Sequence, residues 1–273
     1  MRQKITDTLL RVATWLAAAL TFGALFFLIA YILTRGIPYI KPSLFALHYN
    51  SQNVSLLPAL VTTVLMVLLS LAVAVPLGLF TAIYLVEYAK RGNPLVRMVR
   101  MTAETLSGIP SIVYGLFGML FFVTWLGWGF SILAGTFTLA IMILPLILRT
   151  AEESLKAVPD TYREGAFGLG AGRLRTVFRI VLPAAAPGIL AGVILAVGRI
   201  VGETAALTYT AGTVAQIPES LMASGRTLSV HMYALSSEGL YTGQAYATAV
   251  VLLVLVAGIN TLSAALAKKI GKG

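Results

Sequence analysis

Long apolar runs alternate along this chain with short segments that hold most of its charged residues. A helix crosses the hydrocarbon core of a bilayer with about 20 residues, because each residue advances it by about 1.5 Å. Six runs are suitable and predict six transmembrane helices, at residues 12–34, 57–88, 105–125, 131–148, 184–207 and 245–266. The predicted fold class is therefore an all-α membrane protein.

The composition agrees with this pattern. Of the 273 residues, 58% are hydrophobic and 11% are charged, which excludes an ordinary soluble domain. The chain has no cysteine, so disulfides and thiolate metal sites are excluded. The two histidines, His48 and His231, are far apart and both fall in predicted loops. We expect no metal site and no cofactor in this chain.

The net charge of +10 would suggest a nucleic-acid partner in a soluble protein, but its distribution favours another explanation. If both termini are cytoplasmic, three of the twenty basic residues lie outside and Arg199 lies within a span. The outer three are Arg35, Lys41 and Arg226. The cytoplasmic set is Arg2, Lys4, Arg11, Lys90, Arg91, Arg97, Arg100, Arg149, Lys156, Arg163, Arg173, Arg175, Arg179, Lys268, Lys269 and Lys272. The positive-inside rule therefore predicts that both termini face the cytoplasm.

The first apolar run is longer than the core of a typical signal peptide, and no A-x-A-like cleavage site follows it. We interpret it as a retained helix. The chain then divides into an N-terminal helix with an outer loop, residues 1–56, and a main transmembrane domain, residues 57–268.

Arg199 and Glu203 lie four residues apart in the fifth predicted span, a spacing that puts both side chains on one helix face. Each charge costs about 2.5–3.5 kcal/mol at mid-bilayer on insertion scales. Arg199 is about 22 Å along the span at 1.5 Å per residue, beyond the midplane. The pair either lines the route of a polar solute, with Thr204 adding a hydroxyl, or forms an ion pair with a structural or gating role.

The loop at residues 149–183 has the pattern of a helical hairpin. Thr161 and Glu164 fit a capping box that would start a helix at 161–169, with Asp160 as an alternative cap. Gly170 and Gly172 offer a turn that ends this helix. A second helix would run from Arg173 toward Pro183. Alone, this pattern is equally typical of an amphipathic interfacial helix and of a knob that docks on another protein.

The spacing within this loop carries a resemblance. The loop contains Glu164, Gly165, Ala166 and Gly170, followed after nine residues by Ile180, Leu182 and Pro183. This resembles the EAA signature of ABC-importer permeases, E-A-A-x3-G-x9-I-x-L-P, with Gly165 replacing the first alanine. That replacement loosens a helix by up to about 1 kcal/mol. The resemblance implies a type I importer permease fold and a coupling helix that docks on a cytoplasmic ATPase.

Two further segments resemble phosphate-transport permeases of this family. Residues 108–118 read GIPSIVYGLFG, and residues 198–205 read GRIVGETA. Residues 225–233 and 245–249 look more like PstA than PstC subunits. In the first segment Gly108 and Pro110 should break or bend the helix. Ser107, Ser111 and Tyr114 would then form a polar stripe, although small residues there also permit close helix packing.

The resemblance implies a permease subunit for phosphate import in the prokaryotic plasma (inner) membrane, in contact with lipid and not with nucleic acid. Its partners would be a second permease (PstC-like), two ATPase subunits (PstB-like) and an external phosphate-binding protein (PstS-like). No G-x-x-x-x-G-K-[ST] motif occurs, so ATP would bind to the partners and this chain would not be an enzyme. The alternatives are a permease for molybdate, sulfate or phosphonate, an ATP-independent secondary transporter, and a non-transporting membrane scaffold.

Overall fold

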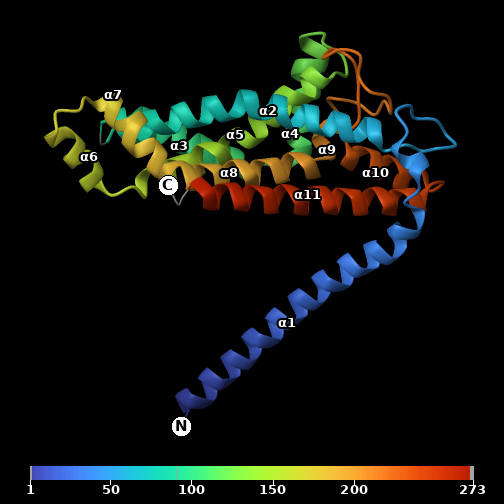
Figure 1. The fold of residues 1–273 in the computed structure, drawn as a ribbon, viewed down its shortest axis with the longest axis horizontal. Helices are drawn as coiled ribbons and strands as arrows, with labels where there is room; N and C mark the ends of the chain where they lie inside the picture. Colours follow the sequence, from blue (N-terminus) through green and yellow to red (C-terminus); the bar gives the residue numbers. More distant parts are fainter. Residues whose placement is uncertain (1, 91, 271–273) are drawn as a thin grey trace.

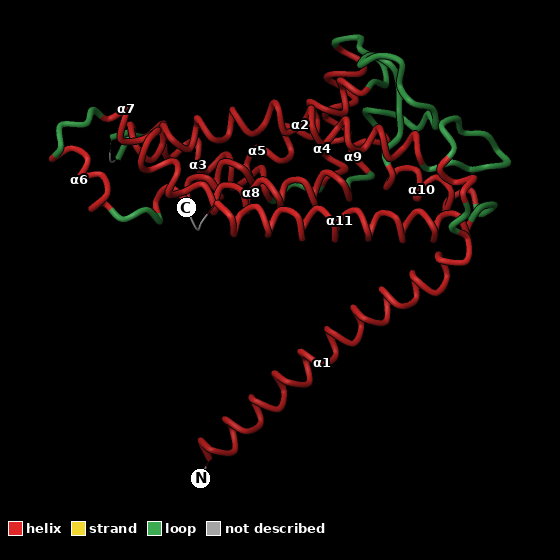
Figure 2. Tube along the Cα trace, viewed as in Figure 1, coloured by secondary structure: helices red, strands yellow, loops and turns green. Residues whose placement is uncertain are grey.

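The computed structural model describes residues 2–90 and 92–270, in which helices are joined by turns and loops, with no strand among them. Arg91 and Lys272 of the predicted cytoplasmic set lie outside the described residues, as do the side chains of Arg2, Lys4, Lys268 and Lys269. The helices are α1 Arg2–Gly36, α2 Leu57–Ile83, α3 Pro94–Ser107, α4 Ser111–Gly118, α5 Ile132–Lys156, α6 Asp160–Gly168, α7 Arg173–Thr176, α8 Leu182–Gly202, α9 Ala205–Thr208, α10 Leu228–Glu238 and α11 Thr242–Ile270 (Figures 1 and 2).

Three π-helical segments extend this framework. Tyr84–Tyr88 follows α2, Met119–Trp125 follows α4, and Val177–Val181 joins α7 to α8. Short 3-10 turns at Ile37–Tyr39 and Pro42–Phe45 follow α1. The hairpin of α6 and α7 lies at one end of the molecule, and α10 lies with the longest loops at the opposite end (Figure 1).

Within the part of the chain that the structure describes, five helical segments are long and apolar enough to cross a membrane, or six if a bent pair of helices counts as one span. The five are Asp7–Tyr39, Leu57–Tyr88, Ile132–Lys156, Arg173–Gly202 and Thr242–Ser263, and they contain or largely overlap five of the six predicted spans. The predicted span at 57–88 matches the observed bounds. The span predicted at 131–148 continues as helix to Lys156, because hydropathy falls at Arg149 while the helical backbone does not end there.

The remaining predicted span, 105–125, is not one straight helix. α3 and the run Ser111–Trp125 meet at an angle of 103°. Gly108 ends α3, and Pro110 is extended at φ −60° and ψ 143° before α4 begins. A proline has no N–H and holds the residue before it away from the helical region, so the chain bends where the sequence predicts a break. The start predicted at residue 105 is wrong, because residues 105–107 belong to α3.

The core forms where α5 packs against α2 and α8. Met66, Ile143, Ile147 and Ile200 are fully buried there. Glycine allows the closest approach: a Cβ at Gly192 of α8 would fall on the Thr150 hydroxyl of α5. Small residues at such crossings let helices in lipid gain van der Waals contact. Bonds add to this packing, because the Ser70 hydroxyl donates to the Thr136 carbonyl across α2 and α5 at 3.3 Å.

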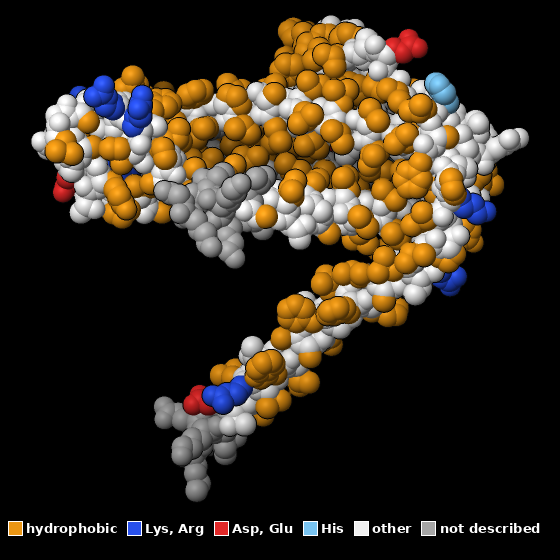
Figure 3. All heavy atoms as spheres, viewed as in Figure 1, with side chains coloured by type: hydrophobic (Ala, Val, Ile, Leu, Met, Phe, Trp, Pro, Cys, Tyr) orange, Lys and Arg blue, Asp and Glu red, His pale blue; other side chains and the backbone are white. Residues whose placement is uncertain are grey.

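α1 leaves this body near α10 and runs away from it (Figure 1). None of its apolar window is buried. Its surface is covered by apolar side chains, as is most of the body between the two ends (Figure 3). An apolar rod of this length is stable when lipid or another membrane helix surrounds it.

Candidate functional site

The segment that holds Arg199 and Glu203 is a helix end. α8 stops at Gly202, and Glu203 is extended at φ −73° and ψ 128°. The Glu203 carboxylate turns forward, and its Oε1 accepts a hydrogen bond from the Ala206 amide at 3.0 Å, which caps α9. The prediction of one helix through residue 207, with both charges on one face, is therefore wrong. A carboxylate that caps the following helix terminates α8 inside an apolar run, and hydropathy does not detect this.

Arg199 is half-buried in the last turn of α8. Within the described chain its side chain has no ion pair, with Glu203 or with any other carboxylate. Its charge acts on the nearby hydroxyl of Tyr114 in α4. The ion-pair alternative is thus not supported by the geometry. The guanidinium keeps its five N–H donors in an otherwise apolar helix, a form suited to binding an oxyanion.

The other predicted pathway residues are arranged unevenly. Tyr114 is buried, and its hydroxyl donates to the Leu106 carbonyl across the bend at 2.7 Å. Ser111 is half-buried in the first turn of α4. Ser107, by contrast, belongs to α3 and donates to Ala103 at 2.6 Å. The bend therefore interrupts the predicted stripe of Ser107, Ser111 and Tyr114.

Thr204 lies at the wall of an open cleft of about 900 Å³. Its neighbours in the wall include Thr208 of α9, Arg35 and Tyr31 of α1, and Tyr246 of α11. Arg35 stacks over the Tyr31 ring at 5.6 Å, which holds the cation at the wall. Arg199, Glu203, Ser111 and Tyr114 are not part of this wall, so the structure brings only one of the five predicted pathway residues to the cleft.

α10 and the segment before it contribute a cluster of buried polar side chains. His231 is fully buried on α10, so its prediction as a loop residue is wrong. Burial first, and then the nearby Arg226 charge, lower the pKa of His231 to about 3. Tyr49 contacts both residues: the Arg226 guanidinium lies 4.8 Å from its ring centre, and the His231 ring meets its edge. His231 is therefore neutral at physiological pH.

At the opposite end of the bundle, α6 forms the predicted short helix of the hairpin. Glu164 and Gly165 are exposed and Ala166 is buried. Gly170 has φ +80° and supplies the left-handed turn, while Gly172 is extended and precedes α7. The predicted capping box is absent: Pro159 precedes α6 without a side-chain cap, and Asp160 is its first residue.

The second arm of the hairpin continues without interruption into α8. α7 and the π-helical segment run into the first turn of α8, where Pro183 lies. Ile180 is half-buried and Pro183 is exposed. Thr176, Val177 and Val181 are buried, and the two valines belong to the same apolar cluster as Ala151 and Leu155 at the end of α5. Val177 and Val181 thus attach this arm to the body, and the helical run Arg173–Gly202 connects the hairpin to Arg199.

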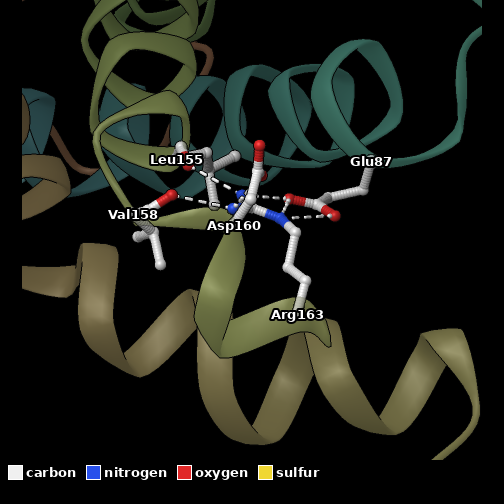
Figure 4. Close-up of polar contacts among 5 residues, drawn as sticks. All are labelled: Glu87, Leu155, Val158, Asp160 and Arg163. Carbon is white, nitrogen blue, oxygen red and sulfur yellow. Dashed lines mark hydrogen bonds and ion pairs between the residues drawn. The ribbon is translucent and has the colours of Figure 1, made fainter. Parts of the chain in front are cut away.

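Sequence reasoning missed the ion pair that attaches α6 (Figure 4). The Arg163 guanidinium contacts the Glu87 carboxylate through Nη2 at 2.7 Å and Nε at 3.1 Å. It also donates to the carbonyl oxygens of Leu155 at 2.9 Å and Val158 at 2.8 Å. The Glu87 carboxylate raises the pKa of Arg163. The partners are 76 residues apart, so no local pattern in a single sequence indicates this pair.

Comparison with known proteins identifies the family of the chain. Residues 74–272 match the family model described as "Binding-protein-dependent transport system inner membrane component". The chain belongs to this family. It is a multi-pass membrane permease, a transport component whose family implies an ATPase and a substrate-binding protein as partners.

Several named proteins are similar in sequence to this permease. The chain is 32% identical over 260 residues to the "Probable ABC transporter permease protein YqgI" of Bacillus subtilis, covering 88% of this chain and 86% of that protein. It is 36% identical over 220 residues to the "Phosphate transport system permease protein PstA" of Mycobacterium leprae, covering 80% and 69%. The PstA protein of Pasteurella multocida is 34% identical over 215 residues, covering 77% and 75%.

Solved structures agree on the fold of the permease. A chain of a bacterial alginate ABC transporter, in complex with its periplasmic protein, superposes with a TM-score of 0.69 at 16% identity, covering 94% of this chain and 96% of that chain. A chain of the inward-facing MetNI methionine ABC transporter gives 0.61 at 18% identity, covering 89% and 97%. The predicted type I ABC-importer permease fold is therefore confirmed.

Proposed function

We propose that this permease is one half of the translocation pathway of an ATP-driven importer of inorganic phosphate. The observation that carries the proposal is the half-buried Arg199, which has no ion pair in the described chain and lies where α8 ends. A cation in an apolar span is expensive unless it meets an anion in transit. The relatives named PstA support phosphate as that anion.

Arg199 supplies the charge for this solute. Its planar fork matches two oxygens of a tetrahedral oxyanion, and it stays protonated at every physiological pH. Phosphate near neutral pH also carries O–H donors, which sulfate lacks. Glu203 is an acceptor for such a donor, and the hydroxyls of Thr204, Ser111 and Tyr114 complete the proposed pathway. Binding must remain weak enough for release.

The hairpin is the proposed coupling element, formed by Glu164, Gly165, Ala166, Gly170, Ile180 and Pro183. The exposed end of α6 would dock on a PstB-like ATPase, which binds the ATP that this chain does not bind. Closure of two such ATPases would move the paired hairpins and swing the spans, a rigid-body change. A PstC-like permease would supply the other half of the pathway, and a PstS-like external protein would deliver phosphate.

The proposed setting is the inner membrane of a prokaryote with both termini in the cytoplasm. The distribution of lysine and arginine supports this orientation. Residues 1–56 would then form a helix and an outer loop beside the transport domain at 57–268. The hairpin would face the cytoplasm, and α10 would face the outside.

Reconstitution of the full importer in proteoliposomes tests the solute role. We expect Arg199→Gln to reduce phosphate uptake to background, while the purified complex still contains all subunits and still hydrolyses ATP. Arg97→Gln is the matched control, because Arg97 is exposed on α3 and has no ion pair in the described chain. Normal uptake by Arg199→Gln rejects the solute role.

Competition and omission separate the alternatives. Excess sulfate, molybdate or phosphonate should leave phosphate uptake unchanged; strong competition by one of them assigns that oxyanion instead. Uptake should stop when the ATPase is left out, whereas a secondary transporter would continue. Glu164→Ala should weaken retention of the ATPase on the permease pair and lower uptake, while the permease pair itself still assembles.

A further inference from the structure

Two consecutive residues of α6 differ sharply in exposure. Glu164 is exposed and has no ion pair within the described chain, whereas the side chain of Arg163 is only 14% exposed. Consecutive positions on a helix are turned by about 100°, so one can face a partner while the next faces the body. α6 therefore has the exposed Glu164 next to the largely buried Arg163.

The inward residue holds three segments together (Figure 4). Arg163 contacts Glu87, which lies in the π-helical turn that ends the α2 run. It donates to the carbonyl of Leu155 in the last turn of α5, and to that of Val158 just after that helix. Carbonyls at a helix end have no partner within the helix, so the guanidinium also caps α5. All three guanidinium nitrogens are used.

This contact is shielded from water. The side chain of Glu87 is 8% exposed, and the pair forms at 2.7 Å with both Nε and Nη2 directed at the carboxylate. Both nitrogens donate to Oε1, and Nε also reaches Oε2 at 3.4 Å, so the two donors fix the orientation as well as the distance. A shielded, two-point contact resists sliding, unlike a contact between apolar surfaces.

α6 also contacts α7 and the π-helical segment Val177–Val181, but it contributes few buried side chains to this packing. Among the nine residues of α6, only Ala166 is classed as buried. Gly165 and Gly168 have open space around them. The remaining polar contact of Arg163 is with Asp160 on the same helix, whose side chain is 82% exposed. Arg163 is the residue of α6, within the described chain, whose side chain bonds both to the α2 run and to the end of α5, so it offers a direct route for force from α6 to α2.

Glu87 lies near the end of a long helical segment that extends through the bundle. The run Leu57–Tyr88 is one helical segment of 32 residues, about 48 Å at 1.5 Å per residue. It packs along α5, the central helix of the core. A displacement at Glu87 is thus applied to the end of a continuous rod that spans the bundle.

We propose that Glu87 and Arg163 form the joint that transmits movement of α6 to α2. This inference rests on the proposed docking of α6 on an ATPase and adds the route by which the movement enters the membrane domain. Both are positioning residues: neither touches the solute or the nucleotide.

The test uses the complete importer in proteoliposomes, with ATP hydrolysis and phosphate uptake measured on the same samples. Glu87→Gln keeps the shape and one acceptor oxygen but removes the charge. Arg163→Lys keeps the charge but removes the fork. Glu153→Gln and Arg97→Lys make the same chemical changes at exposed positions without an ion pair in the described chain.

We expect both joint variants to assemble with the ATPase and to hydrolyse ATP within about twofold of the unmodified complex, since the docking face of α6 is unchanged. Phosphate transported per ATP should fall by about tenfold, which corresponds to a coupling loss of about 1.4 kcal/mol. Glu87→Asp, which keeps the charge, should recover part of the ratio. The two controls should keep it.

An unchanged ratio of phosphate to ATP in Glu87→Gln and Arg163→Lys overturns the proposal. So does a loss of assembled complex without any change of that ratio in the complex that remains, because it shows a purely structural role. Failure of the underlying function looks different. If α6 does not dock on the ATPase, Glu164→Ala leaves ATPase retention unchanged, whatever the joint variants do.

Discussion

The hydroxyl of Ser229 in α10 donates to the carbonyl oxygen of Glu203 at 2.9 Å and lies 3.0 Å from that of Val201. Both acceptors belong to the end of α8, 26 and 28 residues earlier in the chain. A helix that ends inside an apolar region leaves carbonyl groups without partners, and each must find a donor. Ser229 is that donor, so α10 stabilises the helix end beside Arg199.

Removal of this donor should destabilise the protein. Ser229→Ala removes the hydrogen bond to the buried carbonyl oxygen of Glu203, which costs about 1–3 kcal/mol. We expect a lower thermal unfolding midpoint in detergent and slower phosphate uptake by the reconstituted importer. Ser237→Ala is the control, because Ser237 lies exposed on the same helix. Equal midpoints for the two variants would contradict this account of the helix end.

A pair of glycines gives opposite predictions for the same substitution. A Cβ at Gly165 of α6 meets nothing within 4 Å, so Gly165→Ala should stabilise the hairpin helix by up to about 1 kcal/mol. A Cβ at Gly192 of α8 would fall on the Thr150 hydroxyl of α5. Gly192→Ala should therefore separate two core helices and cost about 1–3 kcal/mol.

Thermal unfolding of the two alanine variants in one detergent measures this contrast. The Gly165 variant should retain the ATPase at least as well as the unmodified permease, since alanine is the residue that the EAA signature carries there. Weaker retention by Gly165→Ala would mean that the docking surface needs the smaller residue. An unchanged midpoint for Gly192→Ala would contradict the close approach of α5 and α8.

The sequence predicted the helices where hydropathy and helix geometry agree. The run at 57–88 is mostly apolar, with its one charged residue, Glu87, next to its end and a proline in its first turn, and both of its predicted bounds are confirmed. The hairpin helix was placed within one residue, because Pro159 and Gly170 mark its limits. Its predicted cap failed, since Asp160 is already helical and its side chain pairs with Arg163.

Long-range contacts and buried breaks could not be predicted. α8 ends just before Glu203, whose carboxylate accepts from the Ala206 amide. Because the surrounding residues are mostly apolar, a hydropathy profile predicts a continuous helix here. His231 is predicted in a loop between two spans, yet it lies on α10 and tertiary packing buries it completely. The contact of Arg163 with Glu87 depends on how two distant helix ends meet, which spacing within one sequence does not encode.

Variants of Glu203 separate the role of this side chain as a helix cap from its role as a charged group. Glu203→Gln keeps an acceptor oxygen for the Ala206 amide, so the unfolding midpoint should hold. Glu203→Ala removes the cap and should cost about 0.5–2 kcal/mol. If the carboxylate accepts from phosphate in transit, both variants lose uptake. Normal phosphate uptake by Glu203→Gln would show that Glu203 acts only as a helix cap. Glu219→Gln, exposed in the loop before α10, is the matched control.

The buried His231 should make the protein less stable in acid. Its pKa is lowered to about 3 by burial and by Arg226, whereas an unfolded histidine has a pKa of about 6.5. Below pH 6.5 the unfolded chain binds a proton that the folded chain refuses, so this contribution is complete above 6.5 and is lost as pH falls toward 3. The loss is about 1.4 kcal/mol per pH unit, or about 2 kcal/mol at pH 5.

Unfolding midpoints measured from pH 7.5 to 5 should fall less steeply for His231→Gln than for the unmodified protein. His48→Gln, at an exposed position, should keep the original slope, and equal slopes for all three proteins would show that His231 takes up no proton on unfolding.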